Sequence, residues 1–145
     1  MLLMKSITEH IRRTLAINPE QYSAGVSQNR VRSFGYALAG CLHMLRYAKN
    51  VRIQVLATLI VIAVSFWLGL SRLEWAMIVL SIGLNWFAEF MNAAIESTVN
   101  LISPEYHPMA QIAKDVAAGA ALVTSITALV IAMLVFAPPL WEKLW

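Results

Sequence analysis

The sequence predicts an all-α integral membrane protein with one amphipathic interfacial helix and three transmembrane helices. Of its 145 residues, 59% are hydrophobic and only 13% are charged, and the mean hydropathy is +0.65. These values are too apolar for a soluble domain of this size. The apolar residues are concentrated after residue 52, and most of the 11 lysines and arginines lie at or before it. Because Lys and Arg are enriched on the cytoplasmic side of a first span, we expect a multi-pass protein with a cytoplasmic amino terminus.

Residues 1–29 are predicted to form an extension that precedes a single membrane domain of residues 30–145. The first 17 residues, MLLMKSITEHIRRTLAI, lack the long apolar run and the small-residue cleavage site of a signal peptide. They could form a surface helix or a partly ordered tail, and both interpretations stay open. Residues 18–29 are a linker by their Pro, Gly, Ser and Asn content. The apolar residues that recur every fourth position in the extension are Leu3, Ile7, Ile11 and Leu15.

A second amphipathic segment, residues 33–50, is predicted to lie along the cytoplasmic interface. Residues 53–70 follow without a single charge and have the length of a first transmembrane helix. A polar turn is predicted at residues 71–74, and the second span at 75–101. The apolar face of the interfacial segment is formed by Phe34, Leu38, Leu42 and Leu45.

A loop containing two prolines, residues 103–108, separates the second span from a helix whose membrane part is predicted at 116–136. We expect Pro138 and Pro139 to end this third span, because proline removes a backbone donor from a helix. Trp141 and Trp145 then fall where aromatic residues anchor a helix at the membrane–water interface.

Two classes of function are excluded by what the chain lacks. Cys41 is the only cysteine, so neither a disulfide within the chain nor a zinc motif can form. The basic residues are not accompanied by any nucleic-acid-binding motif, so no nucleic-acid partner is expected.

The second span contains a polar stretch, AEFMNAAIESTVN, at residues 88–100. At about 100° per residue, five polar side chains of the span, four of them in this stretch, share an arc of roughly 80° on one helix face. Glu89 lies about 21 Å along the helix from Trp75, inside a hydrocarbon core about 30 Å thick, and Glu96 lies about 10 Å further toward the cytoplasm. The members of this stripe are Asn85, Glu89, Asn92, Glu96 and Asn100.

Two interpretations of the stripe are possible, because an intramembrane carboxylate is costly and normally faces protein or water. It could be a polar seam that joins helices, or a site at the lipid–water boundary. Glu89 is deep enough to meet the hydroxyl of a lipid headgroup, and Glu96 can meet a soluble reactant. Lys114 and Asp115 follow at the same predicted level, and a lysine is a suitable cation for phosphate. This second group favours a functional site.

These residues resemble the prokaryotic diacylglycerol kinase family, small integral membrane lipid kinases that include undecaprenol kinases. The family pattern reads roughly E-x-x-N-[ST]-A-I-E, then a loop with E-Y-H, then A-K-D. The resemblance covers about residues 30–140, and the loop and AKDVAAGA are most similar to the undecaprenol kinase branch. The matching positions are Glu89, Asn92, Ala94, Ile95, Glu96, Glu105, Tyr106, His107, Ala113, Lys114 and Asp115.

The resemblance implies phosphoryl transfer from ATP to the hydroxyl of a membrane lipid, undecaprenol or diacylglycerol, with Mg²⁺ as cofactor. It also implies a homotrimer in the bacterial inner (plasma) membrane, with active sites shared between subunits. Such chemistry requires positioning and charge neutralisation more than covalent catalysis. By resemblance, Glu89 is the general base and, with Asn85, contacts the lipid, while Glu96 is a magnesium ligand. The expected ATP-binding residues are Tyr36, Asn92, Glu96, Glu105, Tyr106, His107, Lys114 and Asp115.

Three positions depart from the family pattern. Ala48 stands where the family has a second metal-binding Glu, Asn100 where it usually has Asp, and Ala93 where it has Ser or Thr. The alternative hypothesis is therefore a catalytically silent relative that binds nucleotide or lipid. A channel or transporter would need polar residues along the whole second span, but the outer half of this span is apolar. Neutral side chains that could replace the missing carboxylate are Asn50, Gln54 and Asn100.

Overall fold

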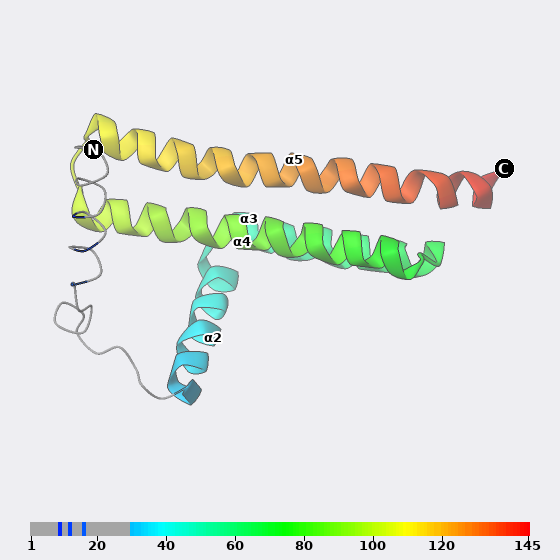
Figure 1. The fold of residues 1–145 in the computed structure, drawn as a ribbon, viewed down its shortest axis with the longest axis horizontal. Helices are drawn as coiled ribbons and strands as arrows, with labels where there is room; N and C mark the ends of the chain where they lie inside the picture. Colours follow the sequence, from blue (N-terminus) through cyan, green and yellow to red (C-terminus); the bar gives the residue numbers. More distant parts are fainter. Residues whose placement is uncertain (1–8, 10–11, 13–15, 17–29) are drawn as a thin grey trace. The chain divides into compact units, whose positions relative to one another are not determined.

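The computed structural model describes residues 30–145 together with Glu9, Arg12 and Ala16. Apart from these three residues, the predictions for the 1–29 extension lie outside the described part of the chain. Residues 30–145 form helices and no strand (Figure 1), which confirms the all-α class. The helices are α2 (Arg30–Tyr47), α3 (Lys49–Leu68), α4 (Arg72–Ile102) and α5 (Pro108–Leu144).

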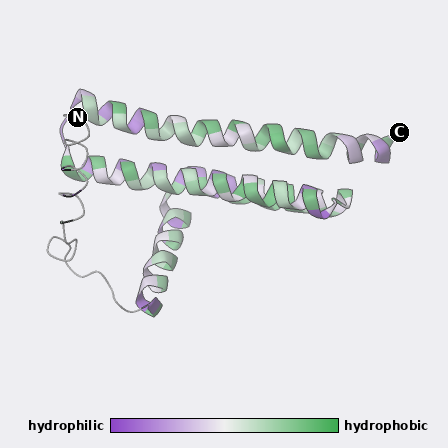
Figure 2. Cartoon of the chain, viewed as in Figure 1, coloured by the Kyte–Doolittle hydropathy of each residue, from purple (hydrophilic) through white to green (hydrophobic). Residues whose placement is uncertain are grey.

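Three of these helices, α3, α4 and α5, are long and apolar enough to cross a membrane. They correspond to the three predicted spans. Figure 2 shows the middle of α5 as predominantly hydrophobic, with hydrophilic residues toward both of its ends. At 1.5 Å per residue, α4 is about 46 Å long and α5 about 55 Å, whereas a hydrocarbon core is about 30 Å thick. Both helices therefore extend beyond the core, and the loop that joins them lies outside it.

The interfacial helix is displaced by three residues from its predicted range of 33–50. It begins at Arg30 and ends at Tyr47. Ala48 is extended, with φ −86° and ψ 113°, and is the N-cap residue of α3. Because the helical conformation is interrupted at Ala48, Lys49 and Asn50 belong to the first turn of α3 rather than to the interfacial helix. The chain divides into two compact units, residues 1–41 and residues 42–145.

The connection between α3 and α4 differs from the predicted turn at 71–74. The turn is made by Gly69, Leu70 and Ser71, with Gly69 in the left-handed conformation (φ 72°) that glycine adopts without a steric penalty. Ser71 and Glu74 form a capping box, with Ser71 N donating to Glu74 Oε2 at 2.7 Å and Glu74 N donating to Ser71 Oγ at 3.4 Å. This reciprocal pairing satisfies helix-end donors, so residues 72–74 are already helical.

The prediction that Pro138 and Pro139 end the third span is wrong, because α5 continues through both to Leu144. A proline inside a helix lacks a backbone donor and its ring crowds the carbonyl four residues earlier, but the chain beyond it still forms helical bonds, such as Trp145 N to Trp141 O at 3.1 Å. Lys143 also holds this end of the helix. Its Nζ donates to Trp67 O and lies 4.9 Å from the centre of the Trp67 ring.

Helices α4 and α5 run side by side along most of their length (Figure 1), and α3 contacts both. The buried cluster of the bundle lies near the α3–α4 turn. Most other large apolar side chains of the three helices are exposed, as expected for surfaces that meet lipid or another subunit. The residues of the buried cluster are Leu68, Leu70, Ile78 and Val135.

Candidate active site

The polar stripe lies on one helix, since α4 runs unbroken from Arg72 to Ile102. Glu89 and Asn92 are half-buried, whereas Glu96 is exposed. Glu89 lies about 20 Å from the Ile102 end of the helix at 1.5 Å per residue. The carboxylates therefore stand at two different depths, the deeper one partly enclosed by the bundle.

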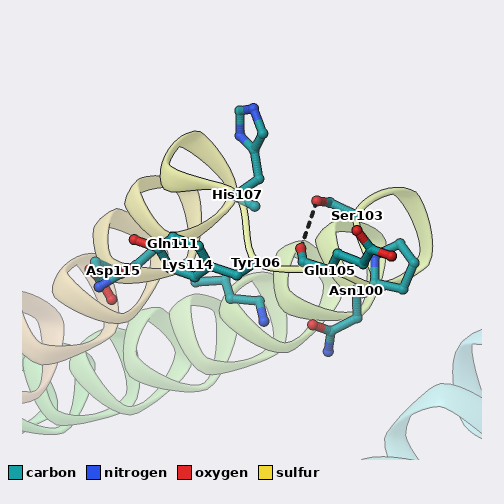
Figure 3. Close-up of a pocket in the computed structure, with 10 residues that line it drawn as sticks. Asn100, Ser103, Glu105, Tyr106, His107, Gln111, Lys114 and Asp115 are labelled. Atoms are coloured by element: carbon teal, nitrogen blue, oxygen red, sulfur yellow. Dashed lines mark hydrogen bonds between the residues drawn. The ribbon is translucent and has the colours of Figure 1, made fainter.

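A polar pocket of about 270 Å³ lies at the junction of α4 and α5. The loop residues Ser103 to His107 close one side of it, and the first turns of α5 close another (Figure 3). Ser103 Oγ donates to the backbone oxygen of Glu105 at 3.1 Å, which fixes the shape of the loop. The pocket brings together six residues that the sequence analysis named: Asn100, Glu105, Tyr106, His107, Lys114 and Asp115.

Lys114 is the cation of this pocket. Its side chain is half-buried on α5, and it points to the same side of the pocket as Asn100 (Figure 3). Within residues 30–145, Lys114 forms neither an ion pair nor a hydrogen bond. An unpaired ammonium group beside backbone and amide groups is suited to a phosphate, which it can meet as a point charge.

His107 has a structural role in addition to its place in the pocket lining. Its Nδ1 accepts a hydrogen bond from Met109 N at 3.2 Å, so the side chain caps α5, with Pro108 in the first turn. In Figure 3 the imidazole ring points away from Lys114 and Asn100. Tyr106 is 80% exposed. Neither side chain is fixed over the centre of the pocket.

Five of the predicted site residues do not line this pocket. Glu89 and Glu96 lie elsewhere on α4, and Asn85 lines a separate cavity between the three long helices. Asn92 lines an apolar cavity of about 320 Å³ between α4 and α5. Tyr36 lies on α2, in the unit of residues 1–41.

The residues present fit a magnesium ion only if ATP supplies most of its ligands. The described residues contain no cluster of three or more His, Cys, Asp or Glu side chains that could hold a metal. Ala48 has no side-chain ligand to offer, and Glu96 is a single exposed carboxylate. Mg²⁺ is commonly held by one or two carboxylates together with phosphate oxygens and waters. Glu96 therefore fits as the one carboxylate of such a site.

Comparison with known proteins decides the family. The profile of the family described as prokaryotic diacylglycerol kinase matches residues 35–136, which is more than half of the chain. The protein belongs to the prokaryotic diacylglycerol kinase family. The match confirms the resemblance found in the sequence and agrees closely with its extent.

Curated members of the prokaryotic diacylglycerol kinase family are similar over most of the chain. An undecaprenol kinase of Bacillus subtilis is 38% identical over 109 residues, covering 75% of this chain and 89% of its own. A diacylglycerol kinase of Synechocystis is 36% identical over 116 residues, 79% of this chain and 66% of its own. A diacylglycerol kinase of Pseudomonas aeruginosa is 34% identical over 108 residues, 74% of this chain and 88% of its own.

Several residues of the structure were not predicted as site residues. Ser103 and Gln111 line the pocket, and the proximity of Ser103 to the loop prolines was the only signal that could have suggested it. Thr58 and Trp86 are joined across α3 and α4 by a hydrogen bond of 3.1 Å. No motif connects these two positions, which are 28 residues apart, so sequence reasoning had no means of pairing them.

Proposed function

We propose that this protein transfers the γ-phosphoryl group of ATP to the hydroxyl of a membrane lipid. The observation that carries the proposal is the placing of two unlike groups on packed helices. Lys114 is a cation in a polar pocket at the α4–α5 junction, and no residue of 30–145 forms an ion pair with it. Glu89 is a half-buried carboxylate about 20 Å from the end of α4. A soluble phosphate donor can reach the first group, and a lipid hydroxyl the second.

In the proposed reaction, the oxygen of the lipid hydroxyl attacks the γ-phosphorus of ATP, and Glu89 takes the proton of that hydroxyl. The bond to the leaving oxygen of ADP breaks, and the phosphoryl group passes to the lipid. Lys114 neutralises charge on the phosphates, and Asn92 supports the site from the same helix as Glu89. Glu96 would hold a magnesium ion together with the ATP phosphates, and that ion would supply further charge neutralisation, which phosphoryl transfer requires.

The nucleotide is proposed to lie in the loop pocket. Glu105, Tyr106, His107 and Asp115 line this pocket. We also assign Tyr36 to the nucleotide, by family resemblance alone. This arrangement requires the α4–α5 loop to face the cytoplasm, where ATP is present, and the amino terminus to lie on the same side.

The active form is proposed to be a homotrimer in the bacterial inner membrane. Within one chain, Glu89 and Glu96 lie outside the polar pocket that holds Lys114. A site shared with a neighbouring subunit would complete the arrangement, as the family resemblance implies. The exposed small residues of α5, such as Ala118 and Ala120, allow close approach of a helix from another copy.

The acceptor is proposed to be undecaprenol or diacylglycerol, which are the lipids that the relatives' names contain. Purified protein in lipid micelles should be given Mg-ATP and each of these alcohols in turn, with phosphorylated lipid as the readout. The methyl ether of each alcohol is the matched control, because it has the same chain and no hydroxyl. Transfer to neither alcohol, under conditions where a curated relative is active, would overturn the proposal.

Ala48 favours a second candidate, a silent relative that binds nucleotide or lipid without transfer. The residue lies at the break between α2 and α3, with no side chain able to hold a metal. Nucleotide binding measured by equilibrium dialysis separates the two candidates. Binding without lipid phosphorylation at any Mg²⁺ concentration supports the silent protein, and phosphorylation rules it out.

A further inference from the structure

A second cavity, of about 200 Å³, lies between α3, α4 and α5 and is distinct from the nucleotide pocket. Most of its walls are apolar, formed by side chains such as Val61 and Ile78. Polar side chains also line it, and they come from two different helices: Gln54 and Thr58 from α3, and Asn85 and Trp86 from α4.

Asn85 contacts two hydroxyl groups of α5. Its Oδ1 accepts hydrogen bonds from Ser125 Oγ at 2.9 Å and from Thr124 Oγ1 at 3.3 Å. Within residues 30–145, its amide nitrogen forms no hydrogen bond. Asn85 therefore presents a donor at the cavity wall with its acceptor already occupied.

Gln54 presents the opposite group. Its Oε1 is fully enclosed by the protein and has no hydrogen-bond partner among the described residues. An enclosed acceptor without a partner costs about 1–3 kcal/mol, and the cost is not relieved by lipid tails, which have no donors. The hydroxyl of Thr58 is nearby on the same helix and already accepts from Trp86 Nε1 at 3.1 Å.

We propose that this cavity binds the hydroxyl end of a membrane-soluble alcohol. A hydroxyl donates one hydrogen bond and accepts others, so it can donate to Gln54 Oε1 and accept from the amide of Asn85. The apolar walls accommodate the adjoining hydrocarbon. This inference rests on the proposed function for the choice of an alcohol, and it adds a holding site one helical turn from Glu89. Neither Gln54 nor Thr58 belongs to the family motif that identified the protein.

The test uses a long-chain alcohol that carries a photoactivatable diazirine next to its hydroxyl, and its methyl ether as the matched probe. Both are added to the full chain in phospholipid vesicles without ATP or Mg²⁺, and the labelled peptides are located by mass spectrometry. The alcohol should label the segments around Gln54 and Asn85. The ether should label them about five- to tenfold less, because it cannot donate the hydrogen bond to Gln54 Oε1 and loses the affinity that one hydrogen bond contributes. Excess unlabelled lipid alcohol should compete.

Two variants connect the labelling to the cavity. Gln54→Leu keeps the size of the side chain and removes the acceptor, so about five- to tenfold more alcohol should be needed for half-maximal labelling. Thr127→Val is the control, because the Thr127 hydroxyl is exposed and donates to Val123 O on its own helix. It should leave the labelling unchanged.

Equal labelling by the alcohol and the ether, in the unmodified protein, would overturn the inference whatever the variants do. So would labelling that is spread evenly over the lipid-facing surfaces, which would leave water as the occupant of the cavity. Because the assay contains no ATP, its outcome is separate from that of the proposed function. Labelling without phosphorylation retains the holding site and rejects the kinase, and the reverse result rejects only the holding site.

Discussion

Replacing Asn85 by leucine measures how strongly polar contacts join α4 to α5 inside the bundle. The substitution removes the acceptor of two interhelical bonds, at 2.9 Å from Ser125 Oγ and 3.3 Å from Thr124 Oγ1. Both hydroxyls also lie 2.9 Å from Ala121 O on their own helix. Leucine therefore leaves neither donor without an acceptor, and the additional penalty of an unsatisfied polar group does not arise.

The expected loss follows from these contacts. Interhelical hydrogen bonds in a membrane protein contribute about 0.6 kcal/mol on average and about 1.7 kcal/mol at most. One short and one longer bond give a loss of about 1 kcal/mol in the free energy of unfolding for Asn85→Leu. Ser125→Ala should cause about half of that loss. The double variant should lose less than the sum of the two single variants, because they remove the same bond.

Unfolding is to be followed by far-ultraviolet circular dichroism during titration with a denaturing detergent in mixed micelles. Thr127→Val is again the control, since its hydroxyl bonds only within α5, and it should not shift the transition. A loss above about 3.5 kcal/mol for Asn85→Leu would refute the reasoning, because two such bonds cannot supply it even at their largest contribution. Strict additivity of Asn85→Leu and Ser125→Ala would show that the bond contributes nothing.

Three further predictions concern the proposed transfer of phosphate. Glu89→Gln keeps the shape of the side chain without the base, and should lower turnover by a factor of about 10² or more while ATP binding, measured by equilibrium dialysis, is retained; full turnover would remove Glu89 from that role. Lys114→Ala should raise the Michaelis constant for ATP about tenfold or more, because the phosphates lose a charge-assisted contact, and an unchanged constant would indicate that Lys114 only anchors α5. Ala48→Glu should lower the Mg²⁺ concentration needed for half-maximal activity and raise turnover, since a hard cation gains a carboxylate ligand. Full activity of the unmodified protein at low Mg²⁺, with no effect of the added Glu, would contradict a site built on Glu96 alone.

The number and the position of the long helices could be predicted because apolar length is recorded locally in the sequence. The predicted helix boundaries were wrong where the same residues are compatible with two local structures. Ser71 and Glu74 are polar residues, which suits a turn, but their spacing also suits a capping box, and α4 begins there. Pro138 and Pro139 usually stop a helix, but α5 continues past them to Leu144.

The site was predictable where its residues are close in the chain. Glu105, Tyr106 and Lys114 line one pocket because a short loop and the first turns of α5 bring them together. The cavity that holds Gln54 and Asn85 depends instead on how α3 and α4 are aligned along their length. Periodicity gives the face of each helix and not the alignment between two helices, so the pairing of Trp86 with Thr58 could be found only in the structure.

The short connection between α3 and α4 has a consequence for how the protein enters the membrane. Only Gly69, Leu70 and Ser71 separate the two helices. This connection is too short to span the bilayer, so α3 and α4 insert together. With a cytoplasmic amino terminus, the pair would insert as a helical hairpin whose tip carries Arg72 and Glu74 across the hydrocarbon core. Arg72 and Glu74 carry opposite charges within the first turn of α4, and the Glu74 carboxylate already accepts a hydrogen bond from Ser71 N, which reduces the cost of that passage. The apolar residues of α4 therefore favour the membrane insertion of α3 as well as that of α4.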